Sequence, residues 1–204
     1  MTKLFLASSF KDAANIFVDF ETDMIGKRVT FIPTASIVEK VDFFVAAARK
    51  ALEKMGLIID VLEISSASEE EIKSKLREND YIYVSGGNTF YLLQELQRTG
   101  ADKLIIEEVN KGKLYIGESA GAIIASNNIE YAKGMDSVKK APNLQDYNAL
   151  GLVEFYPLPH FNSFPFKKAV QKIIDTYSSE LDFAIIGNHD AITVQKNKME
   201  IVRG

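Results

Sequence analysis

The sequence contains no cysteine and very little histidine. Among its 204 residues there is no Cys, and the only two histidines are His160 and His189. Without cysteine the chain can form no disulfide framework, no catalytic thiol and no cysteine-ligated zinc site. Two distant histidines, with no His-Glu-x-x-His motif, also make a poor ligand set for a metal. We therefore expect a site that uses no metal or other cofactor, in a protein of the reducing cytoplasm.

Long apolar runs and concentrated charge are missing as well. No run approaches the ~20 apolar residues of a membrane helix. The first apolar run, just after Met1-Thr2-Lys3, is short and lacks a small-residue cleavage site, so we expect no signal peptide. The net charge is −4 and the basic residues are scattered, which argues against a nucleic-acid surface. Neither Gly-x-x-x-x-Gly-Lys-Ser/Thr nor Gly-x-Gly-x-x-Gly is present, so a phosphate-binding loop is not indicated.

The sequence is rich in apolar residues, and predicted strands alternate along it with predicted helices. With 204 residues, 47% of them apolar, it suits one domain covering 1–204. The strands we expect are 3–7, 28–33, 57–62, 80–84, 113–116, 152–158, 184–187 and 192–195, with helices over 12–24, 41–55, 68–78, 89–96, 101–110 and 167–177. Strands apolar on both faces that alternate with helices predict an α/β fold, with a parallel sheet covered on both sides. We expect residues 127–148 to form loops with short strands, and a turn at 196–198 to join the last strand pair.

A serine lies between one of these strands and the next helix. Gly117-Glu118-Ser119-Ala120-Gly121 has the Gly-x-Ser-x-Gly arrangement of a nucleophile elbow. A serine in such a turn has a strained backbone, so its neighbours must be small. The turn raises Oγ above the sheet, and the amide of Ala120 then points to where an oxyanion would form. We interpret Ser119 as a nucleophile.

A serine nucleophile needs a base and a third group that orients the base. His160 follows the stiff segment Pro157-Leu158-Pro159, which suits a fixed imidazole, whereas His189 lies in a turn. We therefore predict His160 as the base. Asp136, which gives the order Ser, acid, His, is the acid we predict. The carboxylates that compete with it for this place are Glu130, Asp146 and Glu154.

A second loop with special backbone follows the strand at 80–84. Gly86 and Gly87 let the backbone approach a ligand closely and present N–H groups to it. Because functional groups in parallel sheets gather at the carboxyl ends of the strands, Gly87 and Ser119 are expected at one edge. The amides of Gly87 and Ala120 would then form an oxyanion hole.

Three segments together resemble the peptidase E family, the S51 serine peptidases, whose relatives include cyanophycinases. They are Ser-Gly-Gly-Asn-Thr-Phe at 85–90, Leu-Tyr-Ile-Gly-Glu-Ser-Ala-Gly-Ala at 114–122 and Pro-His-Phe at 159–161. The resemblance implies a flavodoxin-like fold similar to class I glutamine amidotransferases, with serine in place of their elbow cysteine. It also implies Ser119 as nucleophile, His160 as base, Gly87 and Ala120 as oxyanion donors, and Asn88 and Thr89 beside the substrate.

The well-known members of this family remove an N-terminal aspartate from dipeptides, which an arginine holds by its carboxylate. Here the corresponding stretch is shortened, and Phe166 stands about where that arginine belongs. Lys167 or Lys168 would be a substitute, but lysine lacks the bidentate fork of arginine. We therefore expect contacts with substrate at Phe166 and Lys167, without strict Asp-X specificity.

The sequence thus predicts a serine peptidase that hydrolyses short peptides near the N-terminus through an acyl-enzyme. Its partner would be a small peptide rather than a nucleic acid or a membrane, and the protein would be a monomer or a homodimer. Two alternatives stay open: a small serine esterase, which shares the Gly-x-Ser-x-Gly motif, and an inactive relative that binds a small metabolite or a partner protein.

Overall fold

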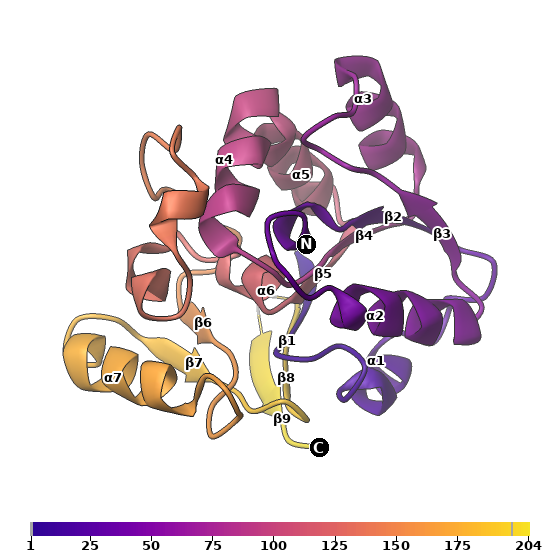
Figure 1. Cartoon of the computed structure of the whole chain (residues 1–204). Coiled ribbons are helices and arrows are strands. Elements are labelled where there is room, and N and C mark those ends of the chain that lie inside the picture. Colours follow the sequence, from indigo (N-terminus) through magenta and orange to yellow (C-terminus); the bar gives the residue numbers. More distant parts are fainter. Residues whose placement is uncertain (1, 197) are drawn as a thin grey trace.

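A computed structural model describes residues 2–196 and 198–204, so Met1 and Asn197, the centre of the expected last turn, lie outside the described residues. Its main sheet has seven strands in the order β3-β2-β4-β5-β1-β8-β9 (Figure 1). These strands are β1 (Lys3–Ala7), β2 (Arg28–Ile32), β3 (Ile58–Val61), β4 (Tyr81–Val84), β5 (Leu114–Glu118), β8 (Ala191–Gln195) and β9 (Lys198–Val202). The expected α/β architecture is confirmed.

The sheet is mostly but not wholly parallel. Strands β1 to β5 pair in parallel, whereas β8 is antiparallel to β1, and β9 is antiparallel to β8. Because β9 follows β8 closely in sequence, only an antiparallel pairing can join them. The predicted strand at 152–158 is shorter than expected: β6 (Tyr156–Leu158) pairs in parallel with β7 (Phe183–Ile185) in a separate two-stranded sheet.

Helices cover both faces of the main sheet. Figure 1 shows α3, α4 and α5 on one side and α1 and α2 on the other, with α7 beside β6 and β7. Their bounds are α1 (Ala14–Phe20), α2 (Phe43–Lys54), α3 (Glu69–Glu78), α4 (Thr89–Thr99), α5 (Ala101–Asn110), α6 (Ala120–Ile123) and α7 (Lys167–Tyr177). Ser68 caps the start of α3, since its Oγ accepts a hydrogen bond from the Glu71 amide at 3.1 Å.

Two apolar cores form because strand residues alternate between the faces of the sheet. In β1, Leu4 and Leu6 belong to the core shared with α3, α4 and α5, while Phe5 and Ala7 belong to the core under α1 and α2. A strand buried on both faces needs a continuous apolar run, which explains why β1 was recognisable in the sequence.

Residues 127–148 differ from the expectation of short strands. They form two 3₁₀ helices, Glu130–Gly134 and Val138–Lys140, and only one isolated bridge, between Asn128 and Asn148. Side-chain contacts between residues close in sequence stabilise this region; for example, Asn128 Oδ1 accepts a hydrogen bond from the Glu130 amide at 2.9 Å. Such local contacts leave little periodic signal in a sequence.

The carboxyl ends of three neighbouring strands meet at one edge of the main sheet. Ser8 follows β1, Gly86 follows β4 and Ser119 follows β5, and these strands are adjacent in the order β4-β5-β1. The parallel strands β6 and β7 are followed by His160 and Asn188 in the same way. The loops that follow strands of the two sheets therefore meet, as the contacts of His160 with Ser8 and Ser119 show.

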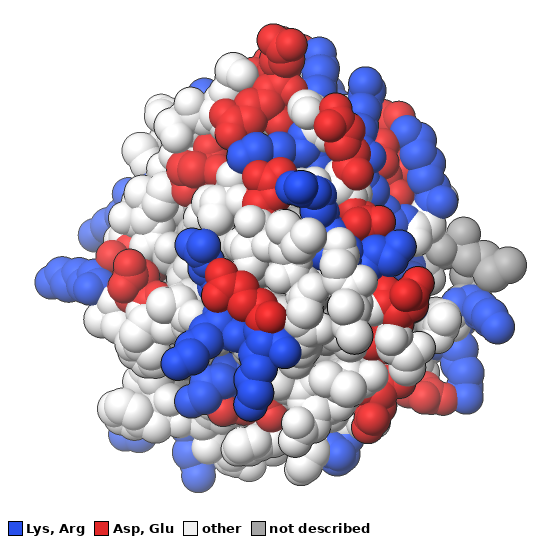
Figure 2. Space-filling view, turned by 90° about the vertical axis from the view of Figure 1, so that its right-hand side faces the viewer, with Lys and Arg blue, Asp and Glu red and all other residues white. Residues whose placement is uncertain are grey.

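The surface carries charges of both signs. On the face seen in Figure 2, Lys and Arg lie among Asp and Glu, with uncharged atoms between them. Within residues 2–196 and 198–204, no helix combines the length and apolar character needed to cross a membrane.

The contact between Gly121 and β4 gives a first prediction. A Cβ at Gly121 would lie 2.2 Å from the carbonyl oxygen of Val84, which is buried backbone that cannot move aside. We expect Gly121→Ala to lower the free energy of unfolding by about 2 kcal/mol or more, as overpacking does. Urea denaturation measures this loss.

Gly100→Ala is the matched control. Gly100 has φ 73° but open space around a Cβ, so that variant tests backbone strain alone, about 1 kcal/mol. Equal losses in the two variants would contradict the steric explanation.

Candidate active site

Ser119 occupies a strained turn between β5 and α6. Its φ is 49° and its ψ is −106°, a conformation that side chains rarely adopt. The turn is held by the Ser119 amide, which donates to the carbonyl of Ala7 at 2.9 Å. Small neighbours are needed, as expected: a Cβ at Gly117 would lie 2.4 Å from the carbonyl oxygen of Gly121. The backbone is thus that of a nucleophile elbow.

His160 lies against this serine. Its Nε2 is 2.8 Å from Ser119 Oγ, although 41 residues separate the two in sequence. The His160 backbone has φ 65° and is fixed by its amide, which donates to Ser8 Oγ at 3.0 Å. The imidazole also stacks on Phe166, with ring centroids 4.7 Å apart. Of the two histidines, the structure therefore brings the predicted one to the serine, whereas His189 has an exposed side chain.

The partner of the second imidazole nitrogen is an amide, Asn188. His160 Nδ1 lies 3.0 Å from Asn188 Oδ1, so Nδ1–H donates to that oxygen and leaves Nε2 free to accept the Ser119 proton. Burial lowers the pKa of His160, and the hydrogen bond to Asn188 opposes this effect only in part. At neutral pH the imidazole is therefore neutral, as a general base must be.

Asp136 binds Thr89 and Asn188 binds the imidazole, which contradicts the prediction that Asp136 orients His160. Asp136 Oδ2 accepts hydrogen bonds from the amide and the hydroxyl of Thr89, at 2.9 and 2.5 Å. Burial raises the pKa of Asp136 to about 6, while the bonds from Thr89 oppose that rise. Asp136 does line the same pocket as Ser119. Its spacing from Ser119 in sequence could not show that the start of α4 binds its carboxylate.

The three rival carboxylates also lie elsewhere. Glu130 pairs with Lys133 at 2.7 Å, Asp146 accepts from the Asn148 amide at 2.8 Å, and Glu154 is exposed. Asn188 was not among the predicted site residues, because its amide carries no charge and the expected partner of the histidine was a carboxylate. The available signal was the turn Asn188-His189-Asp190, which directly follows the strand predicted at 184–187.

The loop after β4 approaches the backbone after β2 very closely. Gly87 has φ 136°, and a Cβ there would lie 2.1 Å from the carbonyl oxygen of Ala35. Only glycine fits this position. Among the hydrogen bonds of the described residues, neither the Gly87 amide nor the Ala120 amide has an acceptor. Both predicted oxyanion donors are thus available.

A buried carboxyl lies directly beneath the elbow. Glu118 is 3% exposed, and its side chain accepts from the Phe10 amide at 2.8 Å and the Tyr83 hydroxyl at 2.7 Å. Burial raises the pKa of Glu118, and these bonds together with one from the Gly86 amide oppose that rise. Glu118 therefore joins the loops after β1 and β4 to the residue before the serine.

Ser119 and His160 open into a pocket of about 590 Å³. Asn88 and Phe166, two of the predicted substrate contacts, line it, and Asn88 also caps α4 by accepting from the Tyr91 amide at 3.0 Å. The other two do not line it: Thr89 is fully buried and binds Asp136, and Lys167 is exposed at the start of α7.

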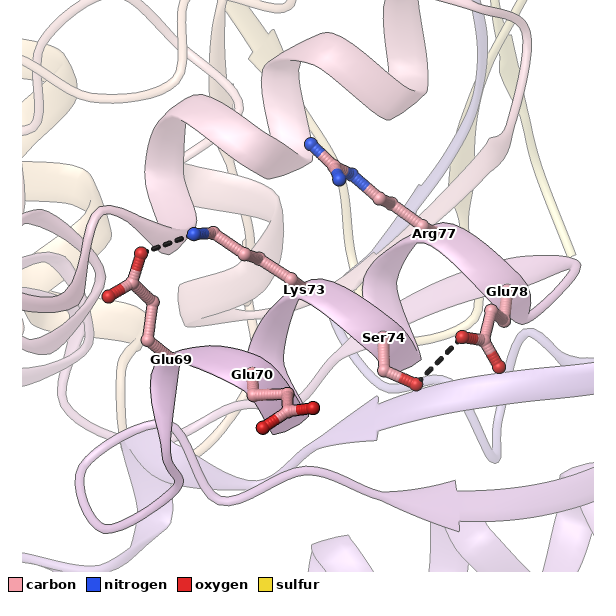
Figure 3. A pocket seen from close by; sticks show the side chains of 6 residues that line it. All are labelled: Glu69, Glu70, Lys73, Ser74, Arg77 and Glu78. Atoms are coloured by element: carbon pink, nitrogen blue, oxygen red, sulfur yellow. Dashed lines mark hydrogen bonds and ion pairs between the residues drawn. The ribbon is translucent and has the colours of Figure 1, made fainter.

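A second hollow lies over the outer face of α3 (Figure 3). Its side chains interact with one another: Lys73 pairs with Glu69, and the Ser74 hydroxyl donates to Glu78 at 2.9 Å. It shares no residue with the Ser119 pocket. The described part of the chain also holds no group of three or more His, Asp or Glu arranged for a metal ion.

Comparisons with known proteins agree on one family. The profile of peptidase family S51 matches residues 4–202. An uncharacterized peptidase of Listeria monocytogenes serovar 1/2a is 58% identical over 195 residues, 96% of this chain and 95% of its own. An uncharacterized peptidase of Pasteurella multocida is 55% identical over 204 residues, which cover all of this chain and 98% of its own. A peptidase E of Shewanella denitrificans is 33% identical over 138 residues, 68% of this chain and 55% of its own.

Solved structures agree with the fold. A 1.5 Å crystal structure of a protein from Listeria monocytogenes EGD-e, provisionally assigned as a peptidase E, superposes with a TM-score of 0.96 at 56% identity. The superposition covers all of this chain and 99% of that one. A peptidase from an acI-B1 actinobacterium, at 22% identity and a TM-score of 0.71, shares the fold.

The neutral partner of His160 gives a prediction about its titration. In Asn188→Asp a carboxylate would stabilise the imidazolium, so we expect the pKa of His160 to rise by about 1 to 3 pH units. A base works in its neutral form, so the acid limb of any pH–rate profile would move upward by the same amount. NMR titration of the imidazole signals measures the pKa directly, with His189→Asn to assign the two histidines.

Asp136→Asn is the control, because Asp136 contacts Thr89 and not the imidazole. We expect it to leave the pKa of His160 nearly unchanged. A large fall in that pKa in Asp136→Asn, or no rise in Asn188→Asp, would contradict the assignment of Asn188 as the orienting group.

Proposed function

Since the chain belongs to peptidase family S51, we propose that it is a serine peptidase that cleaves short peptides near their N-terminus through an acyl-enzyme. The observation that supports this most directly is the 2.8 Å contact between Ser119 Oγ and His160 Nε2, made at a strained elbow beside a pocket. A hydroxyl and a neutral imidazole at this distance form the nucleophile–base pair of acyl transfer.

In the first half of the reaction, Ser119 Oγ attacks the carbonyl carbon of the first peptide bond as its proton moves to His160 Nε2. The Oγ–C bond forms, and negative charge develops on the carbonyl oxygen, which accepts from the Gly87 and Ala120 amides. Asn188 Oδ1 keeps the proton on Nδ1, so that Nε2 is the nitrogen that receives the serine proton.

In the second half, the C–N bond breaks, and the leaving amine takes the proton from Nε2. Water then attacks the ester carbon while giving a proton to His160; the C–Oγ bond breaks, and Ser119 takes that proton back. The products are the N-terminal amino acid and the shortened peptide. This sequence consumes one water and needs no oxidant, metal or cofactor.

We also propose a substrate contact, a cell compartment and an oligomeric state. Asn88 lies beside the substrate, with its Nδ2 donating to the Ser137 carbonyl at 3.2 Å and its Oδ1 held by the α4 cap. The enzyme would act in the cytoplasm on small peptides, as a monomer or a homodimer.

The proposal predicts that Ser119→Ala abolishes peptide hydrolysis, with a loss of at least about 10³-fold, because no other group replaces the nucleophile. Mass spectrometry of a mixed dipeptide and tripeptide library, incubated with each protein, measures it. Ser178→Ala, an exposed serine in the segment after α7, serves as the matched control and keeps full activity.

A fluorophosphonate probe tests the covalent step separately. It should add its mass to the Ser119 protein and not to Ser119→Ala. Hydrolysis of esters but not peptides would favour the esterase alternative. Equal peptide hydrolysis by the two proteins would exclude Ser119 as nucleophile.

A further inference from the structure

Carboxyl groups outnumber basic groups among the residues that line the Ser119 pocket. Lys140 is the one Lys or Arg among the described lining residues, and it is already paired with Glu39 at 2.6 Å. The carboxyl groups that line the pocket are those of Asp12, Glu39, Glu118 and Asp136. The remaining titratable group, His160, is neutral because burial lowers its pKa. The pocket therefore offers no unpaired cation to an incoming anion.

This charge pattern distinguishes between substrate side chains. A carboxylate that entered the pocket would lose hydration without gaining a counter-ion, and it would also meet like charges. A positive group gains instead. The positive group common to all short unblocked peptides is the α-ammonium of the first residue, which lies next to the carbonyl that Ser119 would attack.

Two apolar walls flank the same pocket. One is formed by Val41, Phe43 and Phe44 around the start of α2, and the other by residues 164–166 before α7. Phe43 is 73% exposed and Phe164 is 96% exposed. These are the two phenylalanines among the exposed large apolar residues of the described chain, and both line this pocket. Exposed aromatic groups concentrated at a site indicate a surface that binds an apolar group.

We propose that the pocket selects short peptides with a free α-ammonium and a bulky, uncharged apolar residue at the N-terminus, and that it discriminates against an N-terminal Asp or Glu. The ammonium lies toward the carboxylates, and the first side chain lies between Phe43 and Phe164. The proposal deepens the function proposed above and rests on it, since it requires the peptide's first carbonyl at Ser119.

Binding to Ser119→Ala protein tests this preference without requiring turnover. Isothermal titration with Phe-Ala, Leu-Ala, Ala-Ala, Asp-Ala and N-acetyl-Phe-Ala gives the affinities, and the hydrolysis experiment above separately tests the reaction. We expect Phe-Ala and Leu-Ala to bind at least about tenfold more tightly than Ala-Ala and Asp-Ala, the scale set by burying a large side chain. Acetylation should weaken Phe-Ala by a similar factor.

The outcomes separate the two proposals. Tighter binding of Asp-Ala than of Phe-Ala, equal binding of all five peptides, or binding of none would overturn the proposed selectivity, even if the Ser119 protein hydrolyses peptides. Selective binding of Phe-Ala without any hydrolysis by the Ser119 protein would support the selectivity and overturn the peptidase mechanism.

Variants of the walls locate the preference. Phe164→Ala and Phe43→Ala, made in the Ser119→Ala background, should each reduce the Phe-Ala over Ala-Ala preference by about threefold or more. Phe164→Arg, which brings a cation to the mouth, should raise Asp-Ala binding relative to Phe-Ala. Ile25→Ala is the matched control, because Ile25 is an exposed apolar residue, 84% exposed, that does not line the pocket.

We expect the Ile25→Ala protein to keep the parent preference. If the two phenylalanine variants behaved like Ile25→Ala, the apolar walls would have no part in selection, and the proposal would be wrong. Since Phe164 is almost fully exposed, its replacement removes no core packing, so a loss of folding does not complicate the result.

Discussion

The contact between Ser119 and His160 depends on two parts of the chain that are built separately. The serine comes from the main sheet, where its strained turn is held by the Ala7 carbonyl and by small neighbours. The histidine comes from the two-stranded sheet of β6 and β7. Ser8 connects them, because its Oγ accepts from the His160 amide and donates to the Ile186 carbonyl at 3.2 Å. A contact of this kind forms only when both sheets are in place.

What the sequence could predict follows from how local each signal is. The elbow was recognisable because Gly117, Ser119 and Gly121 lie within one turn, where close packing requires small residues. His160 was found because only two histidines compete for the role. Strands β1, β2, β4 and β5 were visible because burial on both faces requires mostly apolar runs, whereas β3 is only partly buried.

The parts that could not be predicted depend on distances between remote residues. Asp136 lies in a plausible place in sequence, but its carboxylate is bound by the start of α4, a contact across 47 residues. Asn188 carries no charge, and its position beside His160 results from the pairing of β6 with β7. Lys167 is next to Phe166 in sequence, yet only Phe166 lines the pocket, because successive residues at the start of a helix point in different directions.

The carboxyl groups Glu118 and Asp136 bind the loops around the serine, and an amide binds the histidine. Glu118 is a buried carboxyl that lies under the serine and binds the loops after β1 and β4. It thereby stabilises the loop that presents the Gly87 amide, without touching the imidazole. Asn188 orients His160, and its hydrogen bond only partly opposes the lowering of the imidazole pKa by burial. In the proposed mechanism the base is therefore weak but neutral at physiological pH, and stabilisation of the transition state would fall mainly to the fixed backbone amides. Preorganised donors of that kind depend on the glycine backbone at Gly87, whose φ of 136° no other residue would adopt without strain.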